Sequence, residues 1–486
     1  MNIFFPGKLS KLFLFIGVVV ISITLGMLIV YQSALVLVIV GAFLITILIL
    51  ALRSRAILFA LISYYIISYL TGIGLSGGTL SNFLPSSIGF LADFLLISYF
   101  IIVILERLTT HQSIIGWRPL DFSLFALLII STVSALFISN KDFLSILLGF
   151  RTVFESVIVF YIIININSND TLLRSITKLL IGIGIIQLLL GFVYYIFVAD
   201  PARDRDMVVG TMSGVLAMYI LIIISSILLS SIFLSRNKWF FKSVLVLLSP
   251  AMAALGSAVF AFGLHLISYL FVTMLFVRSN SLRVILIITV VILLFISIIS
   301  IYPVLGEAYL SGSVELMGTR GFILGVTDIV DRQLYESYGR VSRILFTMDL
   351  LQGQGSYYVL FGMGPGTTKE GQRTGAIGSL ATDYADIKME NLDFTRILAE
   401  SGVVSFVISL LVILLVAYVG LRVYQYDIDP FWRAVGVGGL VAGLWFIIYL
   451  FYSSVWATGQ SSVFFWSLAG VLVTRARQAN IPIIGL

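Results

Sequence analysis

Residues 208–234 read VVGTMSGVLAMYILIIISSILLSSIFL, a run without a single charged side chain. Lipid offers backbone groups no hydrogen-bonding partner, so such a run predicts a helix that satisfies its own backbone while it crosses a bilayer. Similar runs fill most of the chain, which is 60% hydrophobic and 11% charged, whereas soluble domains are about a quarter charged. The sequence therefore predicts an all-α polytopic membrane protein.

About 14 runs are long enough to be transmembrane helices, or about 12 if the short pair 244–259 and 262–277 is one re-entrant hairpin. The predicted spans are 12–31, 34–52, 56–74, 87–105, 121–139, 152–166, 175–198, 208–234, 244–259, 262–277, 284–301, 402–421, 434–453 and 461–474. This pattern divides the chain into three parts. Residues 1–301 hold eleven spans and a short arginine loop at 199–207, residues 302–398 form one large loop, and residues 399–486 hold three spans and a tail.

The basic residues are distributed unevenly between alternate loops. With the N-terminus in the cytoplasm, 17 of the 29 Lys and Arg residues fall on the inside. The short outside loops then hold only Lys141, Arg151, Arg203 and Arg205. The positive-inside rule thus predicts a cytoplasmic membrane protein with both termini in the cytoplasm and residues 302–398 outside.

Composition excludes several kinds of chemistry. The chain has no cysteine and two histidines, so thiolate chemistry and a His-rich metal site are both excluded, and we expect no metal and no cofactor. Basic residues on the cytoplasmic side account for much of the net charge of +6, so no nucleic-acid partner is expected.

The large loop Tyr302–Leu398 is the main polar segment of the chain. We predict short helices on the membrane face over 323–330, 341–351 and 357–361, where apolar residues recur at helical spacing or form an aromatic run. Glycine-rich turns join them. The loop carries eight cations: Arg320, Arg332, Arg340, Arg343, Lys369, Arg373, Lys388 and Arg396.

Two groups of arginines are candidates for holding phosphate. Arg203 and Arg205 lie in one short outside loop, with Gly214 in the helix that follows. Arg340 and Arg343 share a helix face in the large loop. The guanidinium fork makes paired bonds to phosphate oxygens. The alternative for the first group is a self-neutralising cluster, since three aspartates surround its two arginines.

The run Gly362-Met-Gly364-Pro-Gly366 follows the second arginine group. Glycine lets backbone amides approach an anion, although a simple tight turn is the commoner explanation. No Gly-Lys-Ser/Thr sequence follows, so the run is not a nucleotide-binding loop.

A third group leads into the span at 402–421. Glu390, Asp393, Arg396 and Glu400 recur every three to four residues, which places them on one face of a helix, next to Asn391. Glu390 or Asp393 could be a general base towards a sugar hydroxyl. The alternative is a solvated helix end, where the helix dipole stabilises carboxylates near the start of the helix. Arg151 and Glu155 are predicted to form a structural ion pair at i, i+4.

These segments together resemble the Wzy-type polymerases of O-antigen and exopolysaccharide assembly, in the superfamily that also contains the O-antigen ligases. Arg203 is followed by Gly214 at the arginine–glycine spacing of those polymerases, and the order of arginine, helix and Gly362–Gly366 is similar. The segment from Asn391 to Gly402 resembles their return into the membrane. The ligases have a histidine just before that asparagine, and Glu390 stands there instead, which favours a polymerase.

The resemblance implies a glycosyltransferase that needs no nucleotide sugar and no metal. It would move a glycan from polyprenyl diphosphate to another lipid-linked repeat unit, in contact with the bilayer, a flippase and a chain-length regulator. Arg340, Glu390 and Asp393 are the expected catalytic residues. The expected substrate-binding residues are Arg203, Arg205, Arg343, Gly214, Gly364, Gly366, Asn391 and Arg396. The alternatives are a ligase that transfers glycan to a final acceptor and a flippase or other transporter of lipid-linked oligosaccharide.

Overall fold

The computed structural model describes residues 88–137, 143–166, 169–197, 214–235, 239–255, 259–276, 340–369, 377–456 and 459–484, together with Leu58 and Ile62. These residues form helices and no strand. The helices are α4 (Ile88–Thr109), α5 (Arg118–Phe137), α6 (Phe143–Asn165), α7 (Asp170–Phe197), α8 (Gly214–Leu234), α9 (Trp239–Leu255), α10 (Val259–Phe276), α14 (Arg340–Gln354), α15 (Ser356–Phe361), α16 (Ser379–Asp383), α17 (Asp393–Tyr426), α18 (Pro430–Leu450) and α19 (Gly459–Gln478), with 3-10 turns η3 (Ala385–Ile387) and η4 (Met389–Asn391).

Six helices of the described part are long and apolar enough to cross a membrane, and the chain is a helical membrane protein. These spans are Arg118–Leu136, Ile146–Asn165, Asp170–Val193, Ala217–Leu234, Asp393–Tyr426 and Pro430–Leu450. The predicted spans at 12–31, 34–52 and 284–301, and nearly all of 56–74, lie outside the described residues. The predicted helix at 323–330 also lies outside them.

Some predicted boundaries are wrong in an instructive way. Two of these helices start earlier than the apolar runs indicated: α6 begins at Phe143 rather than 152, and α17 begins at Asp393 rather than 402. Arg151 therefore lies within α6 and not in an outside loop. In both cases charged residues lie between the start of the helix and the predicted start, Arg151 in α6 and Asp393, Arg396 and Glu400 in α17, and hydropathy alone ends a span where charge begins.

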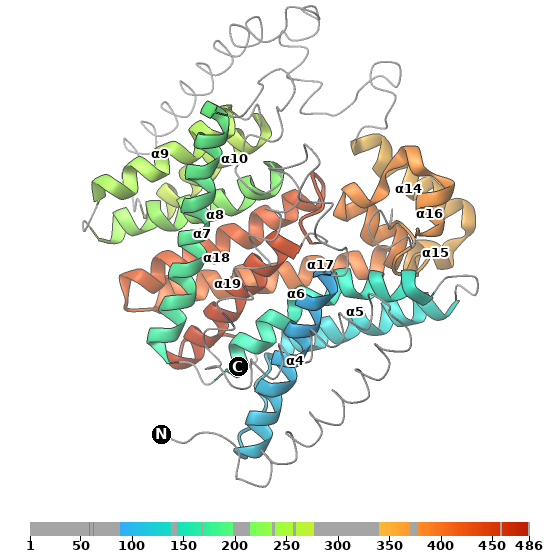
Figure 1. The fold of residues 1–486 in the computed structure, drawn as a ribbon, viewed down its shortest axis with the longest axis horizontal. Coiled ribbons are helices and arrows are strands. Elements are labelled where there is room, and N and C mark those ends of the chain that lie inside the picture. The colour runs from blue at the N-terminus through green and yellow to red at the C-terminus, as the bar shows by residue number, and fades with distance from the viewer. Residues whose placement is uncertain are drawn as a thin grey trace, which may run out of the picture.

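Small residues bring the central helices together. A Cβ atom added to Gly420 of α17 would lie 2.5 Å from the backbone nitrogen of Leu440 on α18. One added to Gly443 of α18 would lie 2.6 Å from the Cβ of Ala417. In a bilayer, helices associate mainly by close packing, which small side chains permit. Helices α17, α18, α8, α19 and α6 form the core that results (Figure 1).

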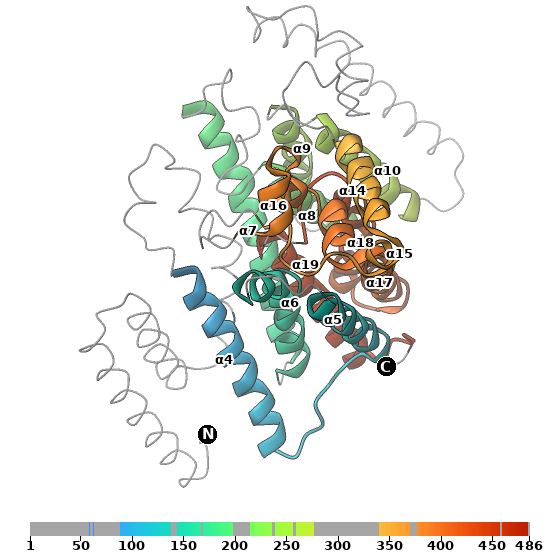
Figure 2. The same ribbon diagram turned by 90° about the vertical axis from the view of Figure 1, so that its right-hand side faces the viewer.

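Helices α14, α15 and α16 gather at one side of the molecule, next to α5 and α17 (Figure 1). Figure 2 looks onto this group from that side. A small apolar cluster of Leu380, Ile387, Met389 and Ala399 holds the group against the start of α17. The predicted helices at 341–351 and 357–361 correspond to α14 and α15.

An ion network ties four helix ends together at the other end of α17. Arg475 at the end of α19 contacts Asp427, which follows α17, at 2.7 Å, and Asp170, which begins α7, at 3.0 Å. Arg174 contacts both Asp170 and Asp429. Since Asp429 also caps α18, the network fixes how α7, α17, α18 and α19 meet.

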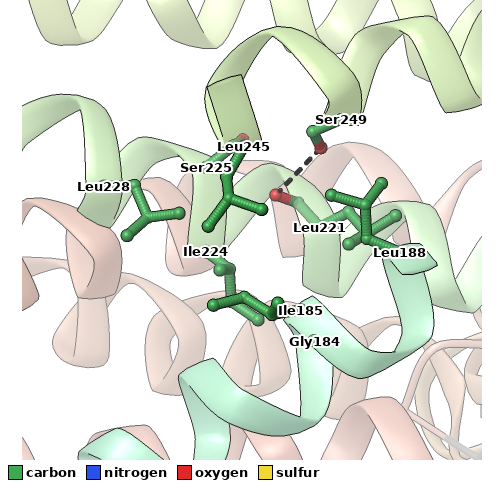
Figure 3. Close-up of a pocket in the computed structure, with 9 residues that line it drawn as sticks. All are labelled: Gly184, Ile185, Leu188, Leu221, Ile224, Ser225, Leu228, Leu245 and Ser249. Carbon is green, nitrogen blue, oxygen red and sulfur yellow. Dashed lines mark hydrogen bonds between the residues drawn. The ribbon is translucent and has the colours of Figure 1, made fainter. Parts of the chain in front are cut away.

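Helices α9 and α10 are two separate helices that pack on each other and on α8. Between α7, α8 and α9 lies a small recess lined by Gly184, Ile185, Leu188, Leu221, Ile224, Ser225, Leu228, Leu245 and Ser249 (Figure 3). The hydroxyl of Ser249 lies 3.5 Å from the carbonyl of Leu221 and 2.8 Å from Nε2 of the buried His265. The hydroxyl of Ser225 donates to Ile222 on its own helix. The lining hydroxyls are thus engaged, and the recess is essentially apolar.

Candidate functional site

Helix α17 is broken near its start. Gly402 has φ 75° and ψ −178°, which is not helical and which L side chains rarely adopt. In an unbroken helix, the carbonyls of Ala399 and Glu400 would accept from the amides four residues further along, and the break removes these bonds. The amides of Met363 and Gly364 replace them, at 2.7 Å to Ala399 and 2.9 Å to Glu400. The glycine-rich run therefore completes the hydrogen bonding of the broken helix.

The close approach of the run to α17 requires glycine on both sides. Gly362 has φ 74°, and a Cβ there would lie 2.4 Å from the backbone nitrogen of Ser401. A Cβ on Gly402 would lie 2.2 Å from the carbonyl oxygen of Leu360. The amide of Gly364, a predicted substrate-binding residue, donates to the carbonyl of Glu400 on α17.

The start of α17 holds a buried charge cluster. The side chains of Asp393, Arg396 and Glu400 are 0%, 1% and 3% exposed. Arg396 donates to Asp393 at 2.8 Å, and its Nη1 lies 4.0 Å from Oε2 of Glu400. The prediction of one shared helix face is confirmed for Asp393, Arg396 and Glu400, whereas Glu390 lies in η4 before the helix begins. The alternative of a solvated helix end is wrong, because these three side chains are buried. A buried carboxylate needs such a partner because desolvation disfavours its charge.

The carboxylate of Asp393 is occupied by further donors. It accepts from the backbone nitrogen of Trp456, and the hydroxyl of Ser454 lies 3.5 Å from it. Both donors belong to the turn between α18 and α19. Asp393 therefore joins this turn to the start of α17 and has no exposed surface towards a substrate.

Glu400 binds the glycine-rich run a second time. Its Oε1 accepts from the hydroxyl of Thr368 at 2.7 Å, with the Thr368 amide at 3.4 Å. Its carbonyl also accepts from the hydroxyl of Ser134 on α5, at 3.1 Å. Glu400 thus connects the loop, α5 and α17 at one point. Neither Thr368 nor Ser134 was singled out from the sequence, because neither carries a motif.

Lys369 follows Thr368 and is partly buried. Burial lowers the pKa of its ammonium group below the ordinary 10.5, and the charge of Arg396 lowers it further. Glu390 and Glu400 oppose this shift, and Arg151 adds to it. Four charged groups from α6, η4 and α17 thus act on Lys369.

The predicted site residues are only partly brought together. Glu390 lies in η4 and is partly exposed, and Asn391 beside it is exposed. Arg343 is partly buried on α14. Arg340 begins α14, and Gly214 begins α8. Arg203 and Arg205 lie outside the described residues.

Gly366 meets α6, a contact that the sequence did not indicate. A Cβ on Gly149 of α6 would lie 2.2 Å from the backbone nitrogen of Gly366 and 2.5 Å from the carbonyl carbon of Pro365. Two residues further along α6, Arg151 pairs with Glu155 at 3.1 Å, which confirms the predicted ion pair. The loop therefore packs against α6 as well as against α17.

Within the described residues, no three His, Asp or Glu side chains are grouped so that they could hold a metal ion. The site therefore consists of cations, carboxylates and hydroxyls. Such groups can bind an anion, orient a hydroxyl or move a proton.

No family model and no curated protein matches this chain.

Proposed function

We propose that this protein is a polysaccharide polymerase of the Wzy type. It transfers a growing O-antigen or exopolysaccharide glycan from polyprenyl diphosphate to the sugar of another lipid-linked repeat unit. The reaction takes place at the outer face of the cytoplasmic membrane, in a bundle of about 14 spans.

One observation carries the proposal. The two segments on which the resemblance rests, 362–366 and 391–402, hydrogen-bond directly to each other through Met363 and Gly364. A likeness between two distant stretches of sequence has more weight when both belong to one site. The site also lies at the start of a membrane-spanning helix, where a lipid-borne diphosphate and a polar glycan can be reached together.

The residues divide into two roles. Arg203 and Arg205, with Arg340 or Arg343, hold the diphosphate and offset the charge that develops on the leaving group. Glu390 is the general base towards the acceptor hydroxyl. It is preferred to Asp393 because Glu390 is partly exposed, whereas Asp393 is enclosed by Arg396 and Trp456.

The test is the length of the polymer made in cells by variants expressed at the wild-type level. We expect Arg203→Ala, Arg340→Ala and Glu390→Gln to shorten the ladder to one or a few repeats. Asp383→Asn is the matched control, because Asp383 is exposed on α16. Wild-type ladders in all three variants would overturn the assignment.

Product analysis separates the remaining functions. Polymer found on polyprenyl diphosphate supports a polymerase, whereas polymer found only on a final acceptor supports a ligase. Transport of lipid-linked oligosaccharide by the reconstituted protein, without any gain in glycan length, supports a flippase.

A further inference from the structure

The short segment that carries Glu390 is anchored by its neighbours in the chain. Two 3-10 turns, η3 and η4, meet at Lys388, whose φ of 50° and ψ of 53° are left-handed and uncommon for such a residue. The side chains of Ile387 and Met389 on either side are buried in the small apolar cluster. Glu390 comes directly after Met389 and is partly exposed. The backbone that carries this carboxylate is thus fixed from below while the carboxylate reaches the surface.

The backbone bond that closes η4 is long. The amide of Leu392 donates to the carbonyl of Met389 at 3.4 Å, whereas such bonds are usually about 2.9–3.0 Å. Hydrogen bonds of 3-10 turns also have poorer geometry than those of an α-helix. The amide of Asn391 donates to the carbonyl of Lys388 at 3.1 Å, which holds the preceding peptide unit. The peptide unit that joins Met389 to Glu390 is therefore only weakly held by the backbone.

The hydroxyl of Thr395 supplies a better bond to this peptide unit. It lies 2.7 Å from the carbonyl oxygen of Met389 and 3.0 Å from that of Leu392. Thr395 is completely buried in the first turn of α17, and its branched side chain has few rotamers. A fixed hydroxyl on a helix thus holds the peptide plane from which the Glu390 side chain starts.

The first turn of α17 is in turn fixed to the rest of the bundle. The amide of Asp393 donates to the carbonyl of Ser453 at 3.3 Å, and its carboxylate accepts from the backbone nitrogen of Trp456. Ser453 and Trp456 both belong to the turn between α18 and α19. The hydroxyl of Thr395 therefore relates Glu390 to the membrane-spanning helices and not only to the loop.

We propose that Thr395 is the positioning residue of Glu390, because its hydroxyl holds the Met389–Glu390 peptide unit so that the carboxylate faces the acceptor hydroxyl. This inference rests on the proposed function, in which Glu390 is the general base. A base must lie within about 2.6–3.2 Å of the group whose proton it takes. A misplacement of about 1 Å can cost a hundredfold in rate. Thr395 thus acts on the rate through the backbone, without touching the substrate.

The test compares two variants that remove different parts of one side chain. Thr395→Val keeps the shape and removes the hydroxyl, whereas Thr395→Ser keeps the hydroxyl and removes the methyl group. Glycan extension is measured with the full chain in nanodiscs, on lipid-linked repeat units extracted from cells that lack this protein. We expect Thr395→Val to lower kcat about tenfold to a hundredfold with KM within about twofold of wild type. Thr395→Ser should keep most of kcat, because the hydroxyl remains.

The matched control is Thr177→Val. Thr177 is also buried, and its hydroxyl also donates to a backbone carbonyl, that of Leu173 at 2.9 Å. It lies on α7, which packs on α8, α9 and α19. This variant loses the same kind of bond away from η4 and should keep the wild-type kcat.

The placement of Glu390 can also be followed without an activity assay. Carbodiimide labelling, read by mass spectrometry, measures the accessibility of each carboxylate. We expect the labelling rate of Glu390 to change in Thr395→Val and to stay at the wild-type value in Thr395→Ser. Asp383, which is exposed on α16, is the internal reference in every sample. If Thr395→Val does not fold, Thr395→Cys replaces it, because a thiol is only a weak donor.

The inference is overturned if Thr395→Val has the wild-type kcat or the wild-type labelling of Glu390. It is also overturned if Thr395→Ser loses as much as Thr395→Val, because the effect then belongs to packing. Failure of the proposed function gives a different result. Labelling of Glu390 that changes in Thr395→Val alone, without glycan extension by the wild type, retains the positioning and removes the polymerase. Glycan extension by the wild type that Thr395→Val leaves unimpaired does the reverse.

Discussion

At the scale of single residues, Arg396 is the side chain on which the buried charge cluster depends. It lies between Asp393 and Glu400, and all three are nearly inaccessible to solvent. Removing one member of a buried pair leaves the other charge without compensation, and this costs more than the pair itself contributes. The cluster is therefore a source of specificity for one arrangement of α17, the loop and the α18–α19 turn.

We predict that Arg396→Met lowers the free energy of unfolding by about 3–5 kcal/mol, because Asp393 stays buried without its cation. The double variant Asp393→Asn, Arg396→Met should lose clearly less than the sum of the two single variants. Thermal unfolding in detergent measures both. Asp349→Asn, at an exposed position of α14, is the control. Strict additivity of the single variants would contradict the coupling.

Residue-level reasoning from the sequence succeeded where spacing decides the outcome. Asp393, Arg396 and Glu400 share a face because a helix repeats every 3.6 residues. It failed for Lys369 and Thr368, since their surroundings come from elements far away in the chain. The sequence also could not decide which of the two predicted catalytic carboxylates is accessible, because Asp393 and Glu390 carry the same charge. The structure shows that Asp393 is enclosed and that Glu390 is partly exposed.

At the scale of elements, the broken helix α17 shows how a loop can become part of a helix. Its break at Gly402 and the turn at Gly362 face each other, and each places a glycine where a Cβ would meet backbone. The sequence predicted the span and the turn separately, because each is a local pattern. Their hydrogen bonds were not predictable, since they join segments distant in sequence.

We predict that Gly402→Ala and Gly362→Ala each lower the melting temperature and the activity together. The strained backbone alone costs on the order of 1–3 kcal/mol, and the clash with Leu360 or Ser401 adds to it. Gly353→Ala on α14 is the control, because nothing lies within 4 Å of the added Cβ and alanine favours a helix. A Gly402→Ala protein as stable as wild type would show that the break is not required.

At the scale of the whole molecule, the site and the ion network lie at opposite ends of α17. The network joins α7, the α17–α18 turn and α19 through Asp170, Asp427 and Arg475. Apolar run length predicted most of these helices. It predicted neither the ends of these helices nor the ion network. A hydropathy profile ends a span at a charged residue, and it gives no information on ion pairs between helices.

We predict that Arg475→Gln lowers the free energy of unfolding on the order of 2–3 kcal/mol, because it leaves the buried Asp427 carboxylate unpaired. The effect should be smaller than for Arg396, since Arg475 is 17% exposed. Polymer length should stay normal at equal protein level, because the network is remote from the site. Thermal unfolding beside in-cell ladders checks this, with Asp383→Asn, at an exposed position of α16, as the control. Shortened polymer at the wild-type protein level would contradict the separation.

The two amides that complete α17 also have a consequence for protein engineering. Residues 362–368 and 393–402 are one transferable unit, although residues 369–392 separate them in the chain. A chimera that exchanges the loop alone would bring foreign amides to the carbonyls of Ala399 and Glu400. A chimera that exchanges only the start of α17 would remove the Glu400 carboxylate to which the hydroxyl of Thr368 donates. Attempts to change substrate range by domain grafting should therefore move both segments together.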